Sequence, residues 1–420
     1  MNSKLAIDGG NPVRTKPFPT VGDASGRTFG EEEIALVTEV LRSGKLFRFG
    51  GKFVPRLEEE FAKLHAVKHA IACTSGTASI HIAVAAVNPD PGDEIITSPI
   101  SDIGSVAPIL FQNAIPVFAD LEPDTYTLDP RSVEERITDR TRAILVVHLL
   151  GQPTDMDGIM QIARQRGLAV IEDCCQAYLA KHKGKLVGTI GDMGCFSLQQ
   201  SKHMTTGDGG ICITDDEDLG SRARLFADKG WPREGPVRDY LFLGLNYRMN
   251  ELTGAVACAQ LGKVEKCVST RRALARRLTE QIRGVEGVNP PVVREGCEHS
   301  YWYYPITIDD QVVGMSPHEF VRALSAEGIP ASAGYIGRPL YLSPVLREKR
   351  TYGSSHCPYD CGRDIEYKEG YCPEAEAILK RLILVGWNEN YSEEDADDIA
   401  AALAKVAQAK RIRPAQGKRS

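Results

Sequence analysis

One lysine stands where the chain passes from an apolar run into hydroxyl, amide and glycine residues. Lys202 follows the largely apolar residues 194–198 and precedes a glycine cluster at 207–210. A lysine held near an apolar wall loses solvation of its charged form, which lowers the pKa of the amine and frees it to attack a carbonyl. Lys202 is therefore a candidate for Schiff-base chemistry, although a single lysine in a polar loop is more often an ordinary surface residue.

Hydroxyls and glycines at two places in the chain have the chemistry of a phosphate site. Gly76 and Thr77 open a predicted helix, where free backbone N–H groups, a hydroxyl and the helix dipole favour an anion. Ser197 and the pair Thr205 and Thr206 offer further hydroxyls. Alone, the first motif is weak, because Ser-Gly-Thr is also a common helix cap.

A carboxylate completes this set of groups. Asp173 ends an apolar run at 168–173, and there it can hold a proton on a heteroaromatic nitrogen, although alone it would more often be structural. A lysine for a carbonyl, a carboxylate for a pyridinium nitrogen and hydroxyls for a phosphate are together the requirements of pyridoxal 5′-phosphate. We therefore predict this cofactor, with Lys202 as its attachment point and as the group that moves the proton.

Short apolar strands alternate with helices around these residues. This pattern predicts an α/β fold with a mostly parallel sheet covered on both faces, in which ligands lie at the carboxyl ends of the strands. Polar clusters at 75–77, 173–176 and 197–202 each follow a predicted strand, so we expect them to meet at one edge of the sheet. The predicted strands are residues 70–73, 94–97, 116–120, 143–148 and 168–173, and the predicted helices are residues 31–41, 55–64, 78–87, 106–111, 130–137 and 156–166.

Three regions are predicted along the chain. Residues 1–29, rich in Gly and Pro, form an extended N-terminal arm, and residues 30–265 form the large cofactor-binding domain. Residues 266–420 form a smaller α+β C-terminal domain. It contains a β-like stretch at 301–308 and helices at 317–327 and 393–408. One long helix is also predicted, running from residue 251 past 268.

Composition limits the class of protein. The 420 residues have a formal net charge of −6, which gives no reason to expect nucleic-acid binding. The 11 cysteines are scattered through apolar segments, a pattern typical of reduced buried thiols in a cytoplasmic protein. We also expect no membrane partner, because no apolar run is long enough to span a bilayer and the first ten residues do not resemble a signal peptide.

Several sequence blocks, in a fixed order, resemble the DegT/StrS family of sugar aminotransferases. The resemblance extends over nearly the whole chain, and seven or more blocks in the right order make coincidence very improbable. The blocks are Ser-Gly-Thr-Ala-Ser (75–79), Gly-Asp-Glu-Ile-Ile (92–96), Pro-Val-Phe-Ala-Asp (116–120), Val-His-Leu-Leu-Gly-Gln-Pro-Thr-Asp-Met-Asp (147–157), Ile-Glu-Asp-Cys-Cys-Gln-Ala (171–177), Phe-Ser-Leu-Gln-Gln-Ser-Lys (196–202), Gly-Asp-Gly-Gly (207–210) and Asn-Tyr-Arg-Met-Asn-Glu (246–251).

The resemblance implies a fold-type I, aspartate-aminotransferase-like homodimer with active sites shared between subunits. It also implies transfer of an amino group from glutamate or glutamine to a nucleotide-linked keto-sugar or a keto-cyclitol, in amino-sugar or aminoglycoside-type biosynthesis. The implied residue roles are Lys202 as the lysine that binds the cofactor, Asp173 at its ring nitrogen, Gln176 beside its ring hydroxyl, Gly76, Thr77 and Ser197 at its phosphate, and Asn246 reaching the phosphate from the partner subunit.

Two departures from the family pattern stand out. Ser101 and Asp102 replace a Thr-aromatic pair whose ring stacks on the cofactor, and Asp102 cannot stack. Asp208 stands where glutamate is commoner. The family also contains dehydratases with histidine in place of the lysine, and relatives that sense without turnover. Because this chain has Lys202, with His203 only its neighbour, transamination is favoured and the other two remain alternatives.

A Cys/His group near the C-terminus supports a remote alternative, a metal-binding interaction protein. It consists of His356, Cys357, Cys361 and Cys372, whose spacing fits no standard zinc pattern. We therefore predict no metal site.

Two further segments offer substrate contacts without assigned roles. The loop at 46–53 interleaves aromatic and basic residues, and either forms a substrate wall or packs its rings on the core. Tyr335, Arg338 and Tyr341 could border the substrate pocket.

Overall fold

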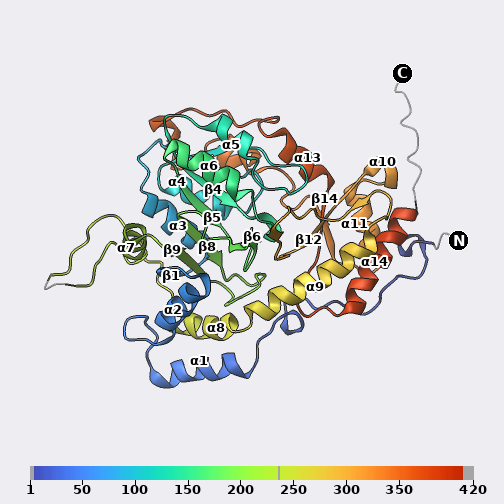
Figure 1. Ribbon diagram of the computed structural model, residues 1–420, viewed down its shortest axis with the longest axis horizontal. Helices are drawn as coiled ribbons and strands as arrows, with labels where there is room; N and C mark the ends of the chain where they lie inside the picture. The colour runs from blue at the N-terminus through green and yellow to red at the C-terminus, as the bar shows by residue number, and fades with distance from the viewer. Residues whose placement is uncertain (1–3, 235–236, 410–420) are drawn as a thin grey trace.

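A seven-stranded sheet forms the centre of the protein in the computed structural model, which describes residues 4–234 and 237–409 (Figure 1). Its strand order is β1-β9-β8-β5-β4-β2-β3. The strands are β1 (His69–Cys73), β2 (Glu94–Thr97), β3 (Ile115–Phe118), β4 (Thr141–Val147), β5 (Ala169–Asp173), β8 (Met193–Ser197) and β9 (Gly210–Thr214).

All but one of these strands run in the same direction. β2, β3, β4, β5 and β8 pair in parallel, while β9 is antiparallel to both of its neighbours, β8 and β1. The register places Asp173 opposite Val147 on one side and Cys195 on the other. The carboxyl ends of β1, β2, β5 and β8 therefore lie at one edge of the sheet, and the predicted α/β class is confirmed.

Helices cover this sheet, and most begin and end close to their predicted positions. Sequence-local caps set the ends: the Ser75 side chain accepts from the Ala78 N–H at the start of α3, and Gly167 ends α6 in a left-handed conformation. The helices of this part are α1 (Glu31–Ser43), α2 (Phe53–His65), α3 (Gly76–Val87), α4 (Ala107–Phe111), α5 (Pro130–Arg136), α6 (Met156–Arg166), α7 (Glu217–Phe226) and α8 (Glu251–Leu261).

The C-terminal part builds a second, four-stranded sheet with its own apolar cluster. The strand order is β10-β12-β14-β13, and α9, α11 and α14 contribute side chains to the same cluster. The elements are α9 (Val264–Ile282), β10 (Val288–Asn289), β12 (Tyr304–Ile308), α10 (Asp310–Val313), α11 (Pro317–Ala326), β13 (Ala331–Ala333), α12 (Pro344–Arg347), α13 (Pro373–Arg381), β14 (Leu382–Val385) and α14 (Glu393–Gln408). A small third sheet joins β6 (Lys181–His182), β7 (Lys185–Leu186) and β11 (Cys297–Glu298).

The prediction of one continuous helix from residue 251 past 268 is wrong. The chain forms two helices, α8 and α9, that break at Gly262 and Lys263. Glycine weakens the helix there, and Lys263 extends its amine to both carboxylate oxygens of Glu33 and to the Thr28 carbonyl. Apolar spacing continues through the break, so the sequence pattern did not show it.

The predicted β-like stretch at 301–308 is shorter than expected, because the strand begins only at Tyr304. Tyr301 has a φ of 54°, a left-handed conformation that a strand does not accept.

The N-terminal arm, described from residue 4, crosses the C-terminal part and reaches the central sheet. Glu327 accepts hydrogen bonds from the backbone N–H groups of Ala6 and Val13, and Arg14 pairs with Asp395 and Asp398. The arm is thus fixed at several points.

The predicted division at residue 265 remains a prediction, and residues 1–3 and 410–420 lie outside the described residues. Side chains from 340–379 pack on the same apolar cluster as the seven-stranded sheet. Within the described residues, no helix combines the length and the apolar character needed to cross a membrane.

Candidate active site

A cavity of about 410 Å³ lies at the carboxyl edge of the central sheet. Six of the seven residues selected from the sequence line it, and they come from the ends of β1, β5 and β8 and from the loop after β8. The cavity residues used below are Gly76, Thr77, Asp102, Ser105, Asp173, Cys175, Gln176, Ser197, Lys202, Asp208, Trp302 and Tyr335.

Lys202 is buried in the wall of this cavity. It lies in the loop between β8 and β9 and is only 9% exposed. Its Nζ lies 3.7 Å from the centroid of the Trp302 ring and has no hydrogen bond or ion pair within the described residues. Burial lowers the pKa of the amine. The group is therefore suited to act as a nucleophile towards a carbonyl.

Asp173 ends β5 with both carboxylate oxygens engaged. Oδ2 accepts a hydrogen bond from the Ser105 hydroxyl at 2.6 Å, and Oδ1 accepts from the backbone N–H of Cys175 at 3.0 Å. Ser105 in turn lies 2.7 Å from the Ser101 hydroxyl. Hydrogen bonds of this kind fix the orientation of the carboxylate towards the cavity.

The start of α3 forms an anion-binding cup. The backbone N–H groups of Gly76 and Thr77, and the Thr77 hydroxyl, have no acceptor within the described part of the chain, while the helix dipole favours negative charge there. A Cβ on Gly76 would lie 2.6 Å from the Ser197 Cβ and 3.0 Å from the Cys175 Sγ. Only glycine fits this approach of α3 to β8, which brings the Ser197 hydroxyl beside the cup.

These groups fit pyridoxal 5′-phosphate. The cavity combines an unpaired buried amine on Lys202, an oriented carboxylate on Asp173 and a cup of free N–H and hydroxyl donors around Gly76 and Thr77. A phosphate, a pyridine nitrogen and an aldehyde require these three kinds of partner.

Gln176 connects the cavity to the C-terminal part of the chain. Its Oε1 accepts from the Leu150 N–H at 2.7 Å, and its Nε2 donates to the Tyr335 hydroxyl at 3.2 Å. Tyr335 has a φ of 44°, a conformation uncommon for a residue with a side chain. Two of the residues considered with Tyr335 do not line the cavity: Arg338 is exposed, and Tyr341 is buried with its hydroxyl donating to Glu376.

Asp102, the residue in place of the family's aromatic, faces the cavity from a short 3₁₀ turn, Ile103–Ser105. Its Oδ1 accepts from the Gly104 N–H at 2.8 Å. No aromatic ring is offered at this position, and the aromatic residues among the cavity's lining are Trp302 and Tyr335.

Asn246 does not line the cavity of its own chain. It lies between β9 and α8 in sequence, and its backbone forms an isolated bridge with Asp228. Its predicted role at the phosphate therefore requires a second copy of the chain, and it remains a prediction.

The sequence analysis also offered hydroxyls and rings that the structure uses elsewhere. The hydroxyls of Thr205 and Thr206 donate to backbone carbonyls of Leu198 and Asp208, so they shape the lysine loop and do not line the cavity. The aromatic loop at 46–53 forms no wall of this cavity. Its Phe53 is buried in a core cluster, while Phe47 and Phe49 are nearly half exposed and lie beside each other.

Two residues in contact with the lysine loop were missed from the sequence. Arg27, on the arm, is 6% exposed and its Nη1 donates to the carbonyls of Gln200 and Lys202 at 2.9 and 3.1 Å. Trp302 donates from Nε1 to the Ser201 carbonyl while its ring contacts the Lys202 amine. Both act across large sequence separations, so no local pattern signals them.

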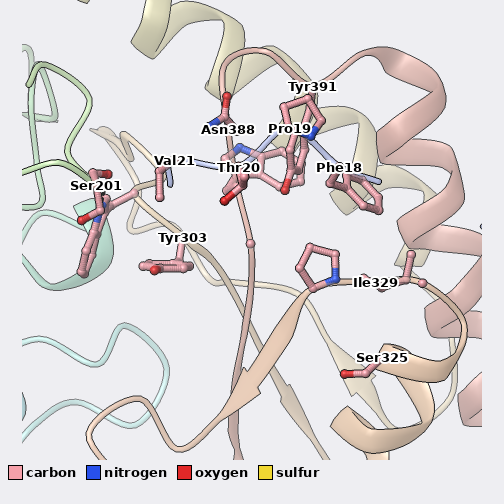
Figure 2. Close-up of a pocket in the computed structure, with 15 residues that line it drawn as sticks. Phe18, Pro19, Thr20, Val21, Ser201, Tyr303, Ser325, Ile329, Asn388 and Tyr391 are labelled. Atoms are coloured by element: carbon pink, nitrogen blue, oxygen red, sulfur yellow. Dashed lines mark hydrogen bonds between the residues drawn. The ribbon is translucent and has the colours of Figure 1, made fainter. Parts of the chain in front are cut away.

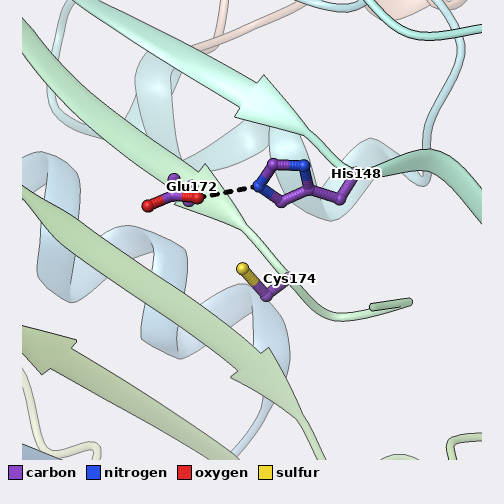
Figure 3. Close-up of side chains that lie close together, drawn as sticks. All are labelled: His148, Glu172 and Cys174. Atoms are coloured by element: carbon purple, nitrogen blue, oxygen red, sulfur yellow. Dashed lines mark hydrogen bonds and ion pairs between the residues drawn. The ribbon is translucent and has the colours of Figure 1, made fainter. Parts of the chain in front are cut away.

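A buried cluster of His148, Glu172 and Cys174 lies beside Asp173 on β5 and on the end of β4 (Figure 3). Both histidine nitrogens are engaged: Nδ1 accepts from the Thr154 N–H, so Nε2 carries the proton and donates to Glu172 at 2.9 Å. Burial alone would raise the pKa of Glu172, but hydrogen bonds from His148 and backbone N–H groups lower it. The cluster holds the strand end that carries Asp173.

The Cys/His group near the C-terminus does not converge. Cys372 is buried against the Phe118 carbonyl, Cys357 contacts Asn113, and Cys361 is exposed. Two groups of three ligand-type side chains within 4.8 Å occur in the described residues, and neither includes these cysteines.

Comparison with known proteins agrees with this geometry. The profile of the DegT/DnrJ/EryC1/StrS aminotransferase family matches residues 27–404. The chain is 34% identical over 427 residues to L-glutamine:2-deoxy-scyllo-inosose aminotransferase of Streptomyces fradiae, covering 97% of this chain and 98% of that relative.

Solved structures share the fold. DesV of S. venezuelae, in complex with a ketimine intermediate, superposes with a TM-score of 0.83 at 27% identity, covering 93% of this chain and 98% of its own. GDP-4-keto-6-deoxy-D-mannose-3-dehydratase of E. coli, with bound hydrated PLP, gives a TM-score of 0.80 at 25% identity, covering 93% and 99%.

Proposed function

The chain belongs to the DegT/DnrJ/EryC1/StrS aminotransferase family, and from this premise we propose that it moves an amino group from glutamine or glutamate to the ketone of a cyclitol or sugar. The observation that carries the proposal is the buried, unpaired amine of Lys202 in one cavity with Asp173. Full-length similarity to an enzyme named for glutamine and a keto-cyclitol supports the substrate class. The product would belong to amino-sugar or aminoglycoside-type biosynthesis.

Each cavity residue has a task in this proposal. Lys202 would hold the cofactor through its amine, and the free amine would move the proton at the substrate carbon, which its lowered pKa favours. Asp173, oriented by Ser105, holds a proton on the ring nitrogen. Gly76, Thr77 and Ser197 bind the phosphate, and Gln176 orients the ring hydroxyl. The bound pyridoxal phosphate supplies an electron sink.

A dehydratase is the second candidate, because one solved neighbour bears that name. Dehydratases of the family carry histidine in place of the lysine. Here His203 is buried beside Lys202, and its Nε2 lies 3.0 Å from the Ser300 carbonyl. It is not among the residues that line the cavity. The position of Lys202 therefore favours transamination over dehydration.

We also propose a homodimer with shared sites, in the cytoplasm. Asn246 has no access to the cavity of its own chain, and exposed apolar side chains lie near it in sequence, with Leu243 95% exposed. A second copy would cover them and bring Asn246 to the phosphate. All 11 cysteines are free thiols, which supports a reducing compartment.

The test is a half-reaction with the donor alone. Purified, cofactor-loaded protein is mixed with glutamine or with glutamate, and the keto acid formed is measured in a single turnover. We expect one equivalent of keto acid per site from at least one donor. Lys202→Ala should abolish the formation of keto acid. The matched control Lys229→Ala, outside the cavity, should leave it unchanged. Failure with both donors in fully loaded protein would contradict the proposal.

A further inference from the structure

A second hollow, of about 510 Å³, lies between the N-terminal arm and the C-terminal part of the chain (Figure 2). In Figure 2, Phe18 and Tyr391 lie at one end of it, and Ser201 and Tyr303 at the other. Its volume is within the range of small-molecule sites. Neither the proposed chemistry nor the cofactor uses it.

The hollow has an aromatic wall, formed by the rings of Phe18, Trp302, Tyr303, Trp387 and Tyr391 together with neutral polar residues. Of the residues that the structure describes, no Asp, Glu, Lys, Arg or His lines it. A ligand that carries a phosphate or carboxylate would find no partner for its charge. Flat aromatic faces instead suit the C–H faces of a saturated ring, whose burial requires no counter-charge.

Two phenolic hydroxyl groups are available in this wall. Those of Tyr303 and Tyr391 have no hydrogen-bonding partner within the described residues. Burial raises the pKa of both phenols, so they keep their protons and donate. Aromatic faces combined with uncharged donors are a surface for a polyhydroxylated ring.

The hollow adjoins the Lys202 cavity through shared walls. Ser201 and Trp302 line both. The Trp302 ring also contacts the Lys202 amine, and its indole N–H donates to the Ser201 carbonyl. An occupant of the hollow would therefore lie next to the reactive lysine.

Charges in the Lys202 cavity disfavour a diphosphate between the two spaces. Among its lining residues the carboxylates are Asp102, Asp173 and Asp208, and Lys202 is the one cation. A nucleoside diphosphate sugar with its base stacked in the hollow would place two phosphates beside these carboxylates, where Lys202 is the one cation among the described lining residues of this chain.

We propose that the hollow between the arm and the C-terminal part binds an uncharged polyhydroxylated ring, a cyclitol or sugar without a nucleotide. This inference rests on the proposed function only in taking the neighbouring Lys202 cavity as the site of amino transfer. The ring is either part of the amino acceptor or a separate ligand, and the two sources share the same chemistry.

The test measures binding to the holoenzyme in the absence of donor, so it succeeds or fails independently of amino transfer. The probes are myo-inositol and uridine diphosphate glucose. Tryptophan fluorescence is the readout, because two of the three tryptophans, Trp302 and Trp387, line the hollow. Tyr391→Phe removes one donor from the hollow, and Tyr352→Phe is the matched control, because it removes a tyrosine hydroxyl that donates to the Leu110 carbonyl outside both spaces.

We expect myo-inositol to bind saturably, and Tyr391→Phe to raise its Kd by about five- to tenfold, the value of one hydrogen bond. Tyr352→Phe should leave this Kd within about twofold of the wild-type value, since Tyr352 lines neither the hollow nor the Lys202 cavity. Competition by myo-inositol against a keto-inositol acceptor would assign the ring to the acceptor, and non-competitive inhibition would assign it to a separate ligand.

Three results would overturn the proposal. The first is saturable binding of uridine diphosphate glucose, weakened by Tyr391→Phe, in place of inositol binding. The second is inositol binding that Tyr391→Phe weakens no more than the control Tyr352→Phe does. The third is no saturable response to myo-inositol up to tens of millimolar. A protein that binds inositol but yields no keto acid from either donor would instead refute the proposed function alone.

Discussion

Replacing Arg27 should loosen the loop that carries Lys202, although Arg27 lies about 170 residues away in the sequence. Its guanidinium donates to the buried carbonyls of Gln200 and Lys202, and its Nε donates to the Gly26 carbonyl. Arg27→Met keeps the length of the side chain and removes every donor. The carbonyls of the lysine loop then lose their partners on the arm.

The expected size follows from these bonds. A hydrogen bond from a charged group contributes roughly 1.5–3 kcal/mol, so two bonds to the loop contribute roughly 3–6 kcal/mol before the cost of burying the guanidinium. That cost is real, because burial lowers the pKa of Arg27. We expect a net loss of about 2–4 kcal/mol, which corresponds to a rise of roughly 30- to 1,000-fold in the Kd for pyridoxal phosphate if it falls entirely on the loop.

Urea unfolding followed by circular dichroism measures the loss of folding stability. Cofactor titration at fixed pH measures the loss of affinity for pyridoxal phosphate. Arg131→Met is the matched control, because Arg131 is 86% exposed and pairs only with Asp129. It should change stability by less than about 0.5 kcal/mol. If Arg27→Met matched this control in both assays, the hydrogen bonds from Arg27 to the lysine loop would contribute neither to stability nor to cofactor binding, and the reasoning would be refuted.

Three further predictions concern titration and thiol access. Burial lowers the pKa of Lys202 below its ordinary 10.5. The rate at which the apoprotein captures pyridoxal phosphate should therefore rise with pH and level off below pH 10.5. A rate that levels off only above pH 10.5 would contradict the burial argument. The unfolded chain binds the Lys202 proton more tightly, so stability from this group rises with pH between the folded pKa and 10.5. Burial lowers the pKa of His65 to about 4 and that of His299 to about 3. The free energy of unfolding should therefore be highest above pH 6.5 and fall on acidification by about 1.4 kcal/mol per pH unit for each histidine. Urea midpoints that stay flat from pH 6.5 to 5 would refute this. Cys361 is the one exposed thiol among the 11 cysteines, all of which are described. One thiol should therefore react rapidly with an aromatic disulfide reagent in native protein, and Cys361→Ser should remove that phase and no other.

Much of the fold is encoded in local sequence signals. Caps and turns such as Ser75 before α3 and Gly167 after α6 are read from neighbouring residues, and β2, α6 and α14 have the bounds expected from the sequence. Polar residues that follow apolar strands were expected to meet because parallel strands end at one edge, and the residues 76, 173 and 202 do share one cavity.

Tertiary contacts account for what the sequence did not reveal. Ser105 could have been found, since it follows β2 in the same way that Asp173 ends β5, yet its bond to Asp173 depends on the packing of α4 and its preceding turn. Arg27 and Trp302 reach the lysine loop from segments whose sequence gives no sign of that contact. The break at Gly262 is likewise set by Lys263 bonding to Glu33 on another helix.

Borohydride reduction of the cofactor-loaded protein, followed by peptide mass spectrometry, tests the central claim most directly. Reduction makes the bond between the cofactor and its lysine permanent, so the modified residue is identified without knowledge of the ketone. We predict a single pyridoxyl-phosphate adduct, on Lys202, that is absent from Lys202→Ala and present in the Lys229→Ala control. An adduct on another lysine, or none in protein saturated with cofactor, would contradict the account.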